Sequence, residues 1–283
     1  MKKLSRHLLA VPAAGWTLLF FVAPLALLFV FSFGTTDLLT YEVNFGWTGQ
    51  HYVDVFQGLY LDAILRSLLL SVGSTLACLL IGFPVAYTIS RAKGRWQLIL
   101  LFAVMVPFWT SFIVRTYGIF NLIADHGPLA RALESLGLIS DDGLHLLFTP
   151  TGIAIGIIYS YLPLMILPLY VALERIDPAL LDAGNDLGAP PWRVLWRVVL
   201  PLAAPGIIAG CVLVGIPATG EYVIPQILGG GKTLMIGNVV ADQFLGVGDY
   251  PFGAALAIVL TIMLMIALAI LRWRAERSEA HVA

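Results

Sequence analysis

The middle of the chain consists of two long apolar runs joined by a short charged loop. Leu146–Leu173 reads LLFTPTGIAIGIIYSYLPLMILPLYVAL, residues 174–197 read ERIDPALLDAGNDLGAPPWRVLWR, and Val198–Gly220 reads VVLPLAAPGIIAGCVLVGIPATG. Neither run contains Asp, Glu, Lys, Arg or His, and a helix of about 20 apolar residues crosses the hydrocarbon core of a bilayer. This stretch therefore predicts two membrane-spanning helices with their connecting loop in water.

Four further runs also lack Asp, Glu, Lys, Arg and His and have nearly the same length. They are Leu8–Thr36, Ser67–Ser90, Trp96–Val114 and Tyr250–Leu271. Of the 283 residues, 59% are hydrophobic and 12% are charged, whereas a soluble domain has about 25% charged residues. We predict an all-α membrane protein with six transmembrane helices. The first run is longer than the apolar core of a signal peptide, about 7–15 residues, and is expected to be an uncleaved anchor.

The third run is the shortest of the six. We expect its helix to continue past Arg115, whose long side chain would then reach the interface between lipid and water.

The basic residues lie almost entirely on one side of these predicted spans. Twelve of the sixteen Lys and Arg residues do so: Lys2, Lys3, Arg6, Arg91, Lys93, Arg95, Arg175, Arg193, Arg197, Arg272, Arg274 and Arg277. Short loops rich in Lys and Arg stay in the cytoplasm. The pattern predicts that both termini are cytoplasmic and that the chain crosses the membrane several times.

The predicted spans divide the chain into three parts. Residues 1–62 form the first transmembrane helix and an external loop, residues 63–271 form a core of five helices with a cytoplasmic loop at 174–201, and residues 272–283 form a cytoplasmic tail. In the external loop Gly34–Asp62 we expect strands or a short helix. A second external helix is expected between Pro128 and Gly137, and the external loop Glu221–Asp249 is expected to be irregular.

The sequence contains no recognisable catalytic motif and no cluster of metal ligands. The five histidines are scattered along the chain. The segment Gly229–Thr233 resembles a phosphate-binding loop, but the P-loop spacing requires a glycine where Gln226 stands, and no strand precedes it. We therefore expect no catalytic residue, no bound metal and no cofactor. If transport is active, its energy source is on another polypeptide.

The loop between the fourth and fifth runs predicts a short amphipathic helix. Asp177 suits the N-cap, Pro178 the first helical position, and Gly188 the end. About ten residues are too few for a stable helix in water without packing partners. The predicted apolar stripe contains Leu180, Ala183, Gly184 and Leu187, while Asp182 and Asp186 lie on the polar face. Small residues in the middle of a stripe allow close docking into a groove.

This loop resembles the cytoplasmic loop of ABC-importer permeases. That family carries Glu-Ala-Ala, three residues, Gly, nine residues, and then Ile-x-Leu-Pro. Here Asp182-Ala183-Gly184 is followed by Gly188, nine residues, and Val198-Val-Leu-Pro201. The spacing matches throughout, and the two departures, Asp for Glu and Gly for Ala, conserve charge or small size.

The resemblance implies the type I ABC-importer permease fold, in which the short helix binds a cleft of a cytoplasmic ATPase. The residues implied in this coupling are Leu180, Leu181, Asp182, Ala183, Gly184, Asp186, Leu187 and Gly188. It also implies as partners a cytoplasmic ABC ATPase dimer that binds ATP, a second homologous permease subunit, a periplasmic or extracellular solute-binding protein and membrane lipid. No nucleic-acid partner is implied.

Three further segments resemble the spermidine/putrescine permease subfamily: Gly220–Pro225, Leu234–Asn238 and Asp249–Gly253. The resemblance implies a permease that forms half of a translocation path for a polyamine. The alternatives are a permease for another small solute, a self-contained secondary transporter and a membrane enzyme. A secondary transporter is expected to carry intramembrane ionisable pairs or an inverted repeat, and neither is visible here.

One carboxylate and several aromatic residues are candidates for the substrate path. Glu221 is placed at the outer end of the fifth span, where an acidic group usually faces a cavity and is suited to bind an ammonium. Trp109, Tyr161 and Tyr222 are candidates for cation–π contacts with the substrate. Tyr117 and Tyr159 are weaker candidates, and Tyr161 is preferred to Tyr159 because it is near Pro163. The alternative role of each aromatic is packing or anchoring at the interface.

Overall fold

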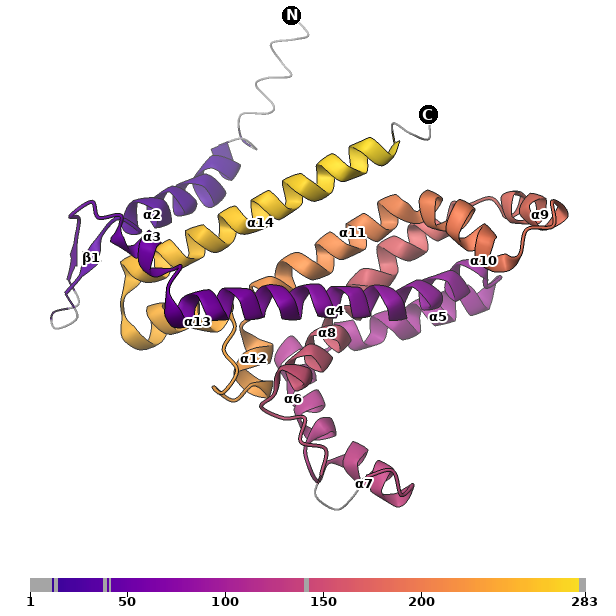
Figure 1. The fold of residues 1–283 in the computed structure, drawn as a ribbon, viewed down its shortest axis with the longest axis horizontal. Helices are drawn as coiled ribbons and strands as arrows, with labels where there is room; N and C mark the ends of the chain where they lie inside the picture. Colours follow the sequence, from indigo (N-terminus) through magenta and orange to yellow (C-terminus); the bar gives the residue numbers. More distant parts are fainter. Residues whose placement is uncertain (1–11, 13–14, 38–39, 41, 140–142, 280–283) are drawn as a thin grey trace, which may run out of the picture. The chain divides into compact units, whose positions relative to one another are not determined.

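The computed structural model describes residues 12, 15–37, 40, 42–139 and 143–279 (Figure 1). Its internal contacts divide the chain into two compact units. The first unit contains Met1–Asp62 and Val239–Met265, and the second contains Ala63–Asn238 and Ile266–Ala283.

Among the described residues, four helices are long and apolar enough to cross a membrane. Their main parts are α4 (Gly58–Arg91), α8 (Pro150–Glu174), α11 (Leu200–Thr219) and α14 (Tyr250–Glu279). The helix that ends in α11 begins at Pro191, because α10 (Pro191–Val194) and η3 (Leu195–Val199) lead directly into it. These four helices correspond to four of the six predicted runs.

The third predicted run forms a bent pair of helices instead of one continuous span. It contains α5 (Arg95–Met105), η2 (Val106–Trp109) and α6 (Phe112–Ile123), and the axis turns by 96° at the break. Thr110 and Ser111 are extended at this break, with ψ angles of 152° and 136°, so the helical ladder of hydrogen bonds is interrupted. The prediction of a single helix through Arg115 is therefore wrong.

The first unit begins with a shorter apolar helix. Gly15–Phe31 is helical and includes η1 (Leu18–Val22) and α2 (Ala23–Phe31). The beginning of the predicted first run lies outside the described residues, and its end differs from the prediction because Thr35–Thr36 forms strand β1. This strand pairs antiparallel with β2 (Val43–Asn44), and the short helix α3 (Gln50–Asp54) follows. The expected strands and short helix of this loop are confirmed.

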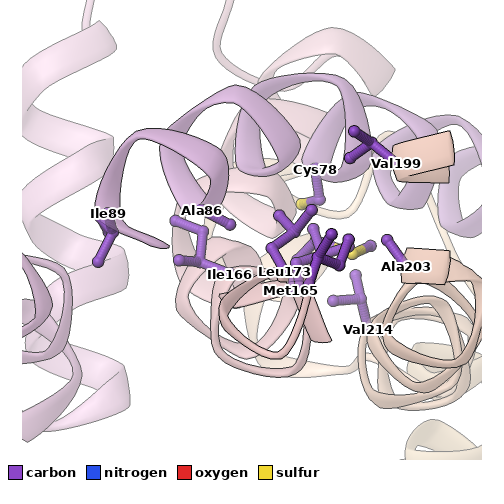
Figure 2. Close-up of a cluster of buried hydrophobic side chains, with 11 residues drawn as sticks. Cys78, Ala86, Ile89, Met165, Ile166, Leu173, Val199, Ala203 and Val214 are labelled. Atoms are coloured by element: carbon purple, nitrogen blue, oxygen red, sulfur yellow. The ribbon is translucent and has the colours of Figure 1, made fainter. Parts of the chain in front are cut away.

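The second unit is held together by an apolar core shared by α4, α8 and the helix that ends in α11 (Figure 2). Cys78 and Ala86 come from α4, Met165 and Leu173 from α8, and Ala203 from α11. All five side chains are fully buried. Burial of apolar area contributes roughly 25 cal/mol per Å² in a soluble protein, but in lipid the close fit of the helices is the larger contribution.

Glycines permit the close approach of α8 and α11. A Cβ atom on Gly206 would lie 2.6 Å from the carbonyl oxygen of Pro168, and one on Gly210 would lie 2.6 Å from Sδ of Met165. Side chains at these positions would force the two helices apart. Small residues four positions apart thus let the backbones of two membrane helices approach closely.

The remaining helices are short. They are α7 (Pro128–Ser135), α9 (Pro178–Asp186), α12 (Val223–Leu228), α13 (Ile236–Asp242) and η4 (Gln243–Val247). Helix α7 confirms the predicted helix that starts at Pro128, and Gly137 follows it with φ +70°. The expectation of an irregular segment at Glu221–Asp249 is wrong, because three of these helices lie within it.

Candidate functional site

The predicted coupling helix α9 is closed at both ends by local hydrogen bonds. Oδ1 of Asp177 accepts from the backbone N–H of Ala179 at 2.9 Å, which is the N-cap contact expected from the sequence. At the other end Gly188 has φ +73°, and the backbone N–H of Ala189 donates to the carbonyl of Gly184 at 3.1 Å. The left-handed glycine lets the chain leave the helix and satisfy its last carbonyls.

Three apolar side chains of this segment face solvent, two on α9 and one on the residue that follows it. The side chain of Leu180 is 48% exposed and that of Leu187 is 87% exposed, and Ala183 between them is also exposed. These positions are three and four residues apart and share one face of a helix. We call Leu180, Ala183 and Leu187 the coupling surface. The two carboxylates beside it, Asp182 and Asp186, are exposed as well.

Two other predicted coupling residues, Leu181 and Gly184, pack inside the chain. A Cβ atom on Gly184 would lie 3.1 Å from Cγ2 of Val194 in α10, and Val194 is buried. Leu181 is half-buried and packs against the core of the second unit. Gly184 thus permits a close contact between α9 and α10, and it does not belong to the exposed face.

A polar cluster ties the beginning of this loop to α4 and α5. The amide Nε2 of Gln97 donates to Oε1 of Glu174 at 2.8 Å and to the hydroxyl of Tyr170 at 3.0 Å. Tyr170 also donates to Oε1 of Glu174 at 2.6 Å. Nη1 of Arg91 donates to the carbonyl of Ile176 at 3.3 Å. Sequence reasoning missed this cluster, because only the Tyr170–Glu174 spacing of four residues signals any of its contacts.

Glu221 lies at the other end of the second unit, and its carboxylate accepts four hydrogen bonds from groups of the same chain. Its side chain is 6% exposed. Oε1 accepts from the backbone N–H groups of Tyr222, Val223 and Ile224 at 3.1, 2.9 and 3.4 Å. Oε2 accepts a hydrogen bond from the hydroxyl of Tyr161. The carboxylate therefore holds the first turn of α12 and links it to the middle of α8.

The structure brings together only some of the predicted path residues. Tyr161 and Glu221 are in contact, and Tyr222 follows directly with 39% of its side chain exposed. Trp109 is 71% exposed, and its described ring contact is with Phe102. Tyr117 and Tyr159 are also exposed.

Arg115 is buried close to this region, contrary to the expectation that it reaches the interface. It is 8% exposed, and its guanidinium donates to the carbonyls of Ser160 and Thr110, both at 3.3 Å. The rings of Phe108 and Phe112 lie 5.3 and 5.8 Å from it. Carbonyl acceptors and aromatic faces both stabilise a buried cation. The bend before α6 turns the side chain inward and explains the error.

These features define a class of protein: a multi-pass helical membrane protein with a short exposed helix in the loop between two spans. The family described as the inner membrane component of binding-protein-dependent transport systems matches residues 8–282. The chain belongs to this family. It is a permease subunit of an ABC importer of the bacterial inner membrane.

Two relatives match nearly the whole chain. The spermidine/putrescine transport system permease protein PotB of Salmonella typhimurium (strain SL1344) is 39% identical over 279 residues, which is 98% of this chain and 96% of the relative. PotB of Escherichia coli (strain K12) is 40% identical over 267 residues, 94% of this chain and 96% of the relative.

The fold is also found in a solved structure. A bacterial ABC transporter involved in the import of the acidic polysaccharide alginate superimposes with a TM-score of 0.73 at 17% identity, over 98% of this chain and 96% of that chain. The predicted type I permease fold is therefore confirmed.

Proposed function

We propose that the chain forms half of the translocation path of an ATP-driven importer for a polyamine such as spermidine or putrescine. The observation that carries this proposal is the identity of about 40% to two PotB permeases over nearly the whole chain. A polyamine is a flexible chain of methylene groups with several ammonium groups. It therefore requires a path with negative charge and aromatic or apolar walls.

The coupling surface supports a cytoplasmic ATPase dimer as a partner. Leu180, Ala183 and Leu187 leave apolar area in water although α9 is too short to be stable without packing. A cleft on the ATPase would bury these side chains. ATP would bind to the ATPase and not to this chain. In this arrangement both termini are cytoplasmic, a second homologous permease completes the path, and a solute-binding protein delivers the cargo from the external side.

Glu221 and its neighbours support a role near the path. The carboxylate brings a negative charge to membrane depth, and Tyr161 occupies one of its oxygens. A substrate ammonium would bind Oε2 directly only if Tyr161 moved away. The exposed rings of Trp109 and Tyr222 are free to contact a passing cation without such a change.

Uptake of labelled spermidine and putrescine tests the cargo. The chain is expressed with its partner subunits in cells that lack other polyamine importers, and unlabelled amines, sugars and anions compete with the label. We expect uptake that depends on ATP and is inhibited by polyamines alone. Failure to accumulate either polyamine, together with ATP-dependent uptake of another labelled solute, would assign the permease to that solute.

A pull-down tests the partners independently of the cargo. We expect the chain, extracted in mild detergent, to retain an ABC ATPase and a second permease. Uptake without any ATPase subunit would contradict the importer and favour a self-contained transporter.

A further inference from the structure

The first unit contains a cavity that the coupling surface and the predicted path do not include. Its volume is about 740 Å³, within the usual range of ligand pockets, about 300–1,000 Å³. The walls come from α3, the beginning of α4, the segment from η4 to Asp249 and the first turn of α14. The lining residues are His51, Asp54, Gln57, Gly58, Leu59, Tyr60, Gln243, Val247, Asp249 and Phe252. The charge pattern of the sequence places this cavity on the external side.

The cavity is lined by two carboxylates, and no Lys or Arg is found among the described residues of its lining. Oδ1 of Asp54 accepts from Nε2 of Gln50 at 3.0 Å. Oδ1 of Asp249 accepts from the backbone N–H of Phe252 at 3.3 Å, as an N-cap of α14. Each carboxylate thus retains an unused oxygen, and neither has an ion-pair partner among the residues that the structure describes. Two unpaired carboxylates at one cavity favour a cationic ligand.

Gln243 is a second and independent indication of a ligand. It lines the cavity and is only 8% exposed, yet its carboxamide forms no hydrogen bond with any described residue. Polar groups with no partner in the protein usually bond to water or a ligand, so this carboxamide is available to a molecule in the cavity. Its carbonyl oxygen is an acceptor suited to an N–H donor.

The remaining walls are suited to an amine with a carbon chain. Nε2 of His51 lies 2.9 Å from the carbonyl oxygen of Gly34, so in the neutral ring Nε2 carries the proton and Nδ1 remains an acceptor. The ring of Phe252 lies 4.7 Å from that of Tyr60 and 5.6 Å from that of His51. Aromatic faces attract ammonium groups and also pack against methylene groups.

We propose that this cavity binds a primary alkylammonium, and that it receives one end of the polyamine before the substrate enters the membrane path. The identity of the amine as cargo rests on the proposed function, whereas ammonium binding rests on the cavity alone. Asp54 and Asp249 supply the charge, Gln243 accepts a hydrogen bond from the ammonium, and Tyr60 with Phe252 contacts the carbon chain.

Protection of an introduced cysteine tests the site directly. Gln57 is exposed and lines the cavity, whereas Val53 on α3 is exposed and does not line it. In the complete transporter, a membrane-impermeant maleimide should label Gln57→Cys and Val53→Cys from the external side. We expect saturating putrescine to slow the labelling of Gln57→Cys several-fold and to leave Val53→Cys unchanged. The uncharged isostere 1,4-butanediol should protect neither cysteine.

Charge-removing variants identify the groups responsible. The double variant Asp54→Asn/Asp249→Asn keeps both hydrogen-bond acceptors and the helix cap but removes both negative charges. We expect it to raise the putrescine concentration needed for protection by about tenfold or more. Asp62→Asn is the matched control, because Asp62 is an exposed carboxylate outside the lining. An unchanged labelling rate of Val53→Cys shows that the double variant is folded, and Asp54→Asn alone gives an intermediate effect.

The outcomes separate the site from the cargo. Three results would overturn the ammonium site. Putrescine does not protect Gln57→Cys, 1,4-butanediol or Mg²⁺ protects it equally well, or putrescine protects it fully in the double variant. Protection without polyamine uptake keeps the site and overturns polyamine as the cargo. Uptake without protection keeps the cargo and overturns the site.

Discussion

Two short helices of the second unit, α9 and α12, achieve their stability in opposite ways. Helix α12 is covered by its own chain: Ile224 and Leu228 are fully buried, and Glu221 accepts hydrogen bonds from three amides of the first turn. Helix α9 has capped ends but presents Leu180, Ala183 and Leu187 to solvent. A helix that packs internally positions other residues, whereas one with exposed apolar side chains is suited to a partner.

This comparison predicts where a substitution will act. Changes around α12 should alter the stability of the permease itself. Changes on the exposed face of α9 should leave the isolated permease intact and alter only what the assembled transporter does.

The largest expected effect comes from Ala183→Glu on the coupling surface. A carboxylate buried without a partner at an interface costs several kcal/mol, so uptake should fall by at least about tenfold and the ATPase should no longer co-purify. Ala132→Glu is the matched control, because Ala132 is an exposed alanine on α7. Normal uptake in Ala183→Glu would show that α9 is not the coupling helix.

The second largest effect is expected for Glu221→Ala. The substitution leaves four donors without their acceptor, and we expect it to destabilise the permease by about 3 kcal/mol, seen as a lower unfolding temperature in detergent. Glu221→Gln keeps a side-chain oxygen for the amides of α12 and should lose less. Unchanged stability with lost uptake in both variants would instead favour direct substrate binding.

A smaller effect is expected for Gly184→Val. The added side chain would press against Val194, whose Cγ2 is 3.1 Å from the position of a Cβ, and overpacking of this kind costs about 1–3 kcal/mol. We expect a modest loss of thermal stability even without the ATPase. Gly188→Ala provides the comparison, because it adds only backbone strain at φ +73°. A loss seen only in the assembled transporter would place Gly184 on the partner surface.

The smallest effect is expected for Tyr161→Phe. It removes the single hydrogen bond to Oε2 of Glu221 and should reduce stability by about 1 kcal/mol. Tyr159→Phe is the control, because Tyr159 is exposed on the same helix. If substrate must displace Tyr161 to reach Glu221, Tyr161→Phe will also lower the KM for uptake, which a purely structural hydrogen bond would not do.

Local patterns were sufficient for much of the fold. The apolar runs at residues 146–173 and 198–220 identified α8 and α11, and Asp177 with Gly188 identified the ends of α9. The bend at Thr110 was missed because the apolar run continues through it, so hydropathy carries no signal of the break. The helices within Glu221–Asp249 were missed because each is short and because the glycines at 229–231 suggested an irregular segment.

Two features could be predicted without coordinates: that this chain spans a membrane, and that one of its loops resembles the coupling loop of a permease. Both follow from the length of apolar runs and from the spacing of capping and small residues. Which of these residues face solvent and which pack inside the chain became clear from the arrangement of the helices. That arrangement placed Tyr161 on Glu221, Gly184 against Val194, and Asp54 with Gln243 around one cavity. Such pairs are far apart along the chain, and only the packing of helices brings them together.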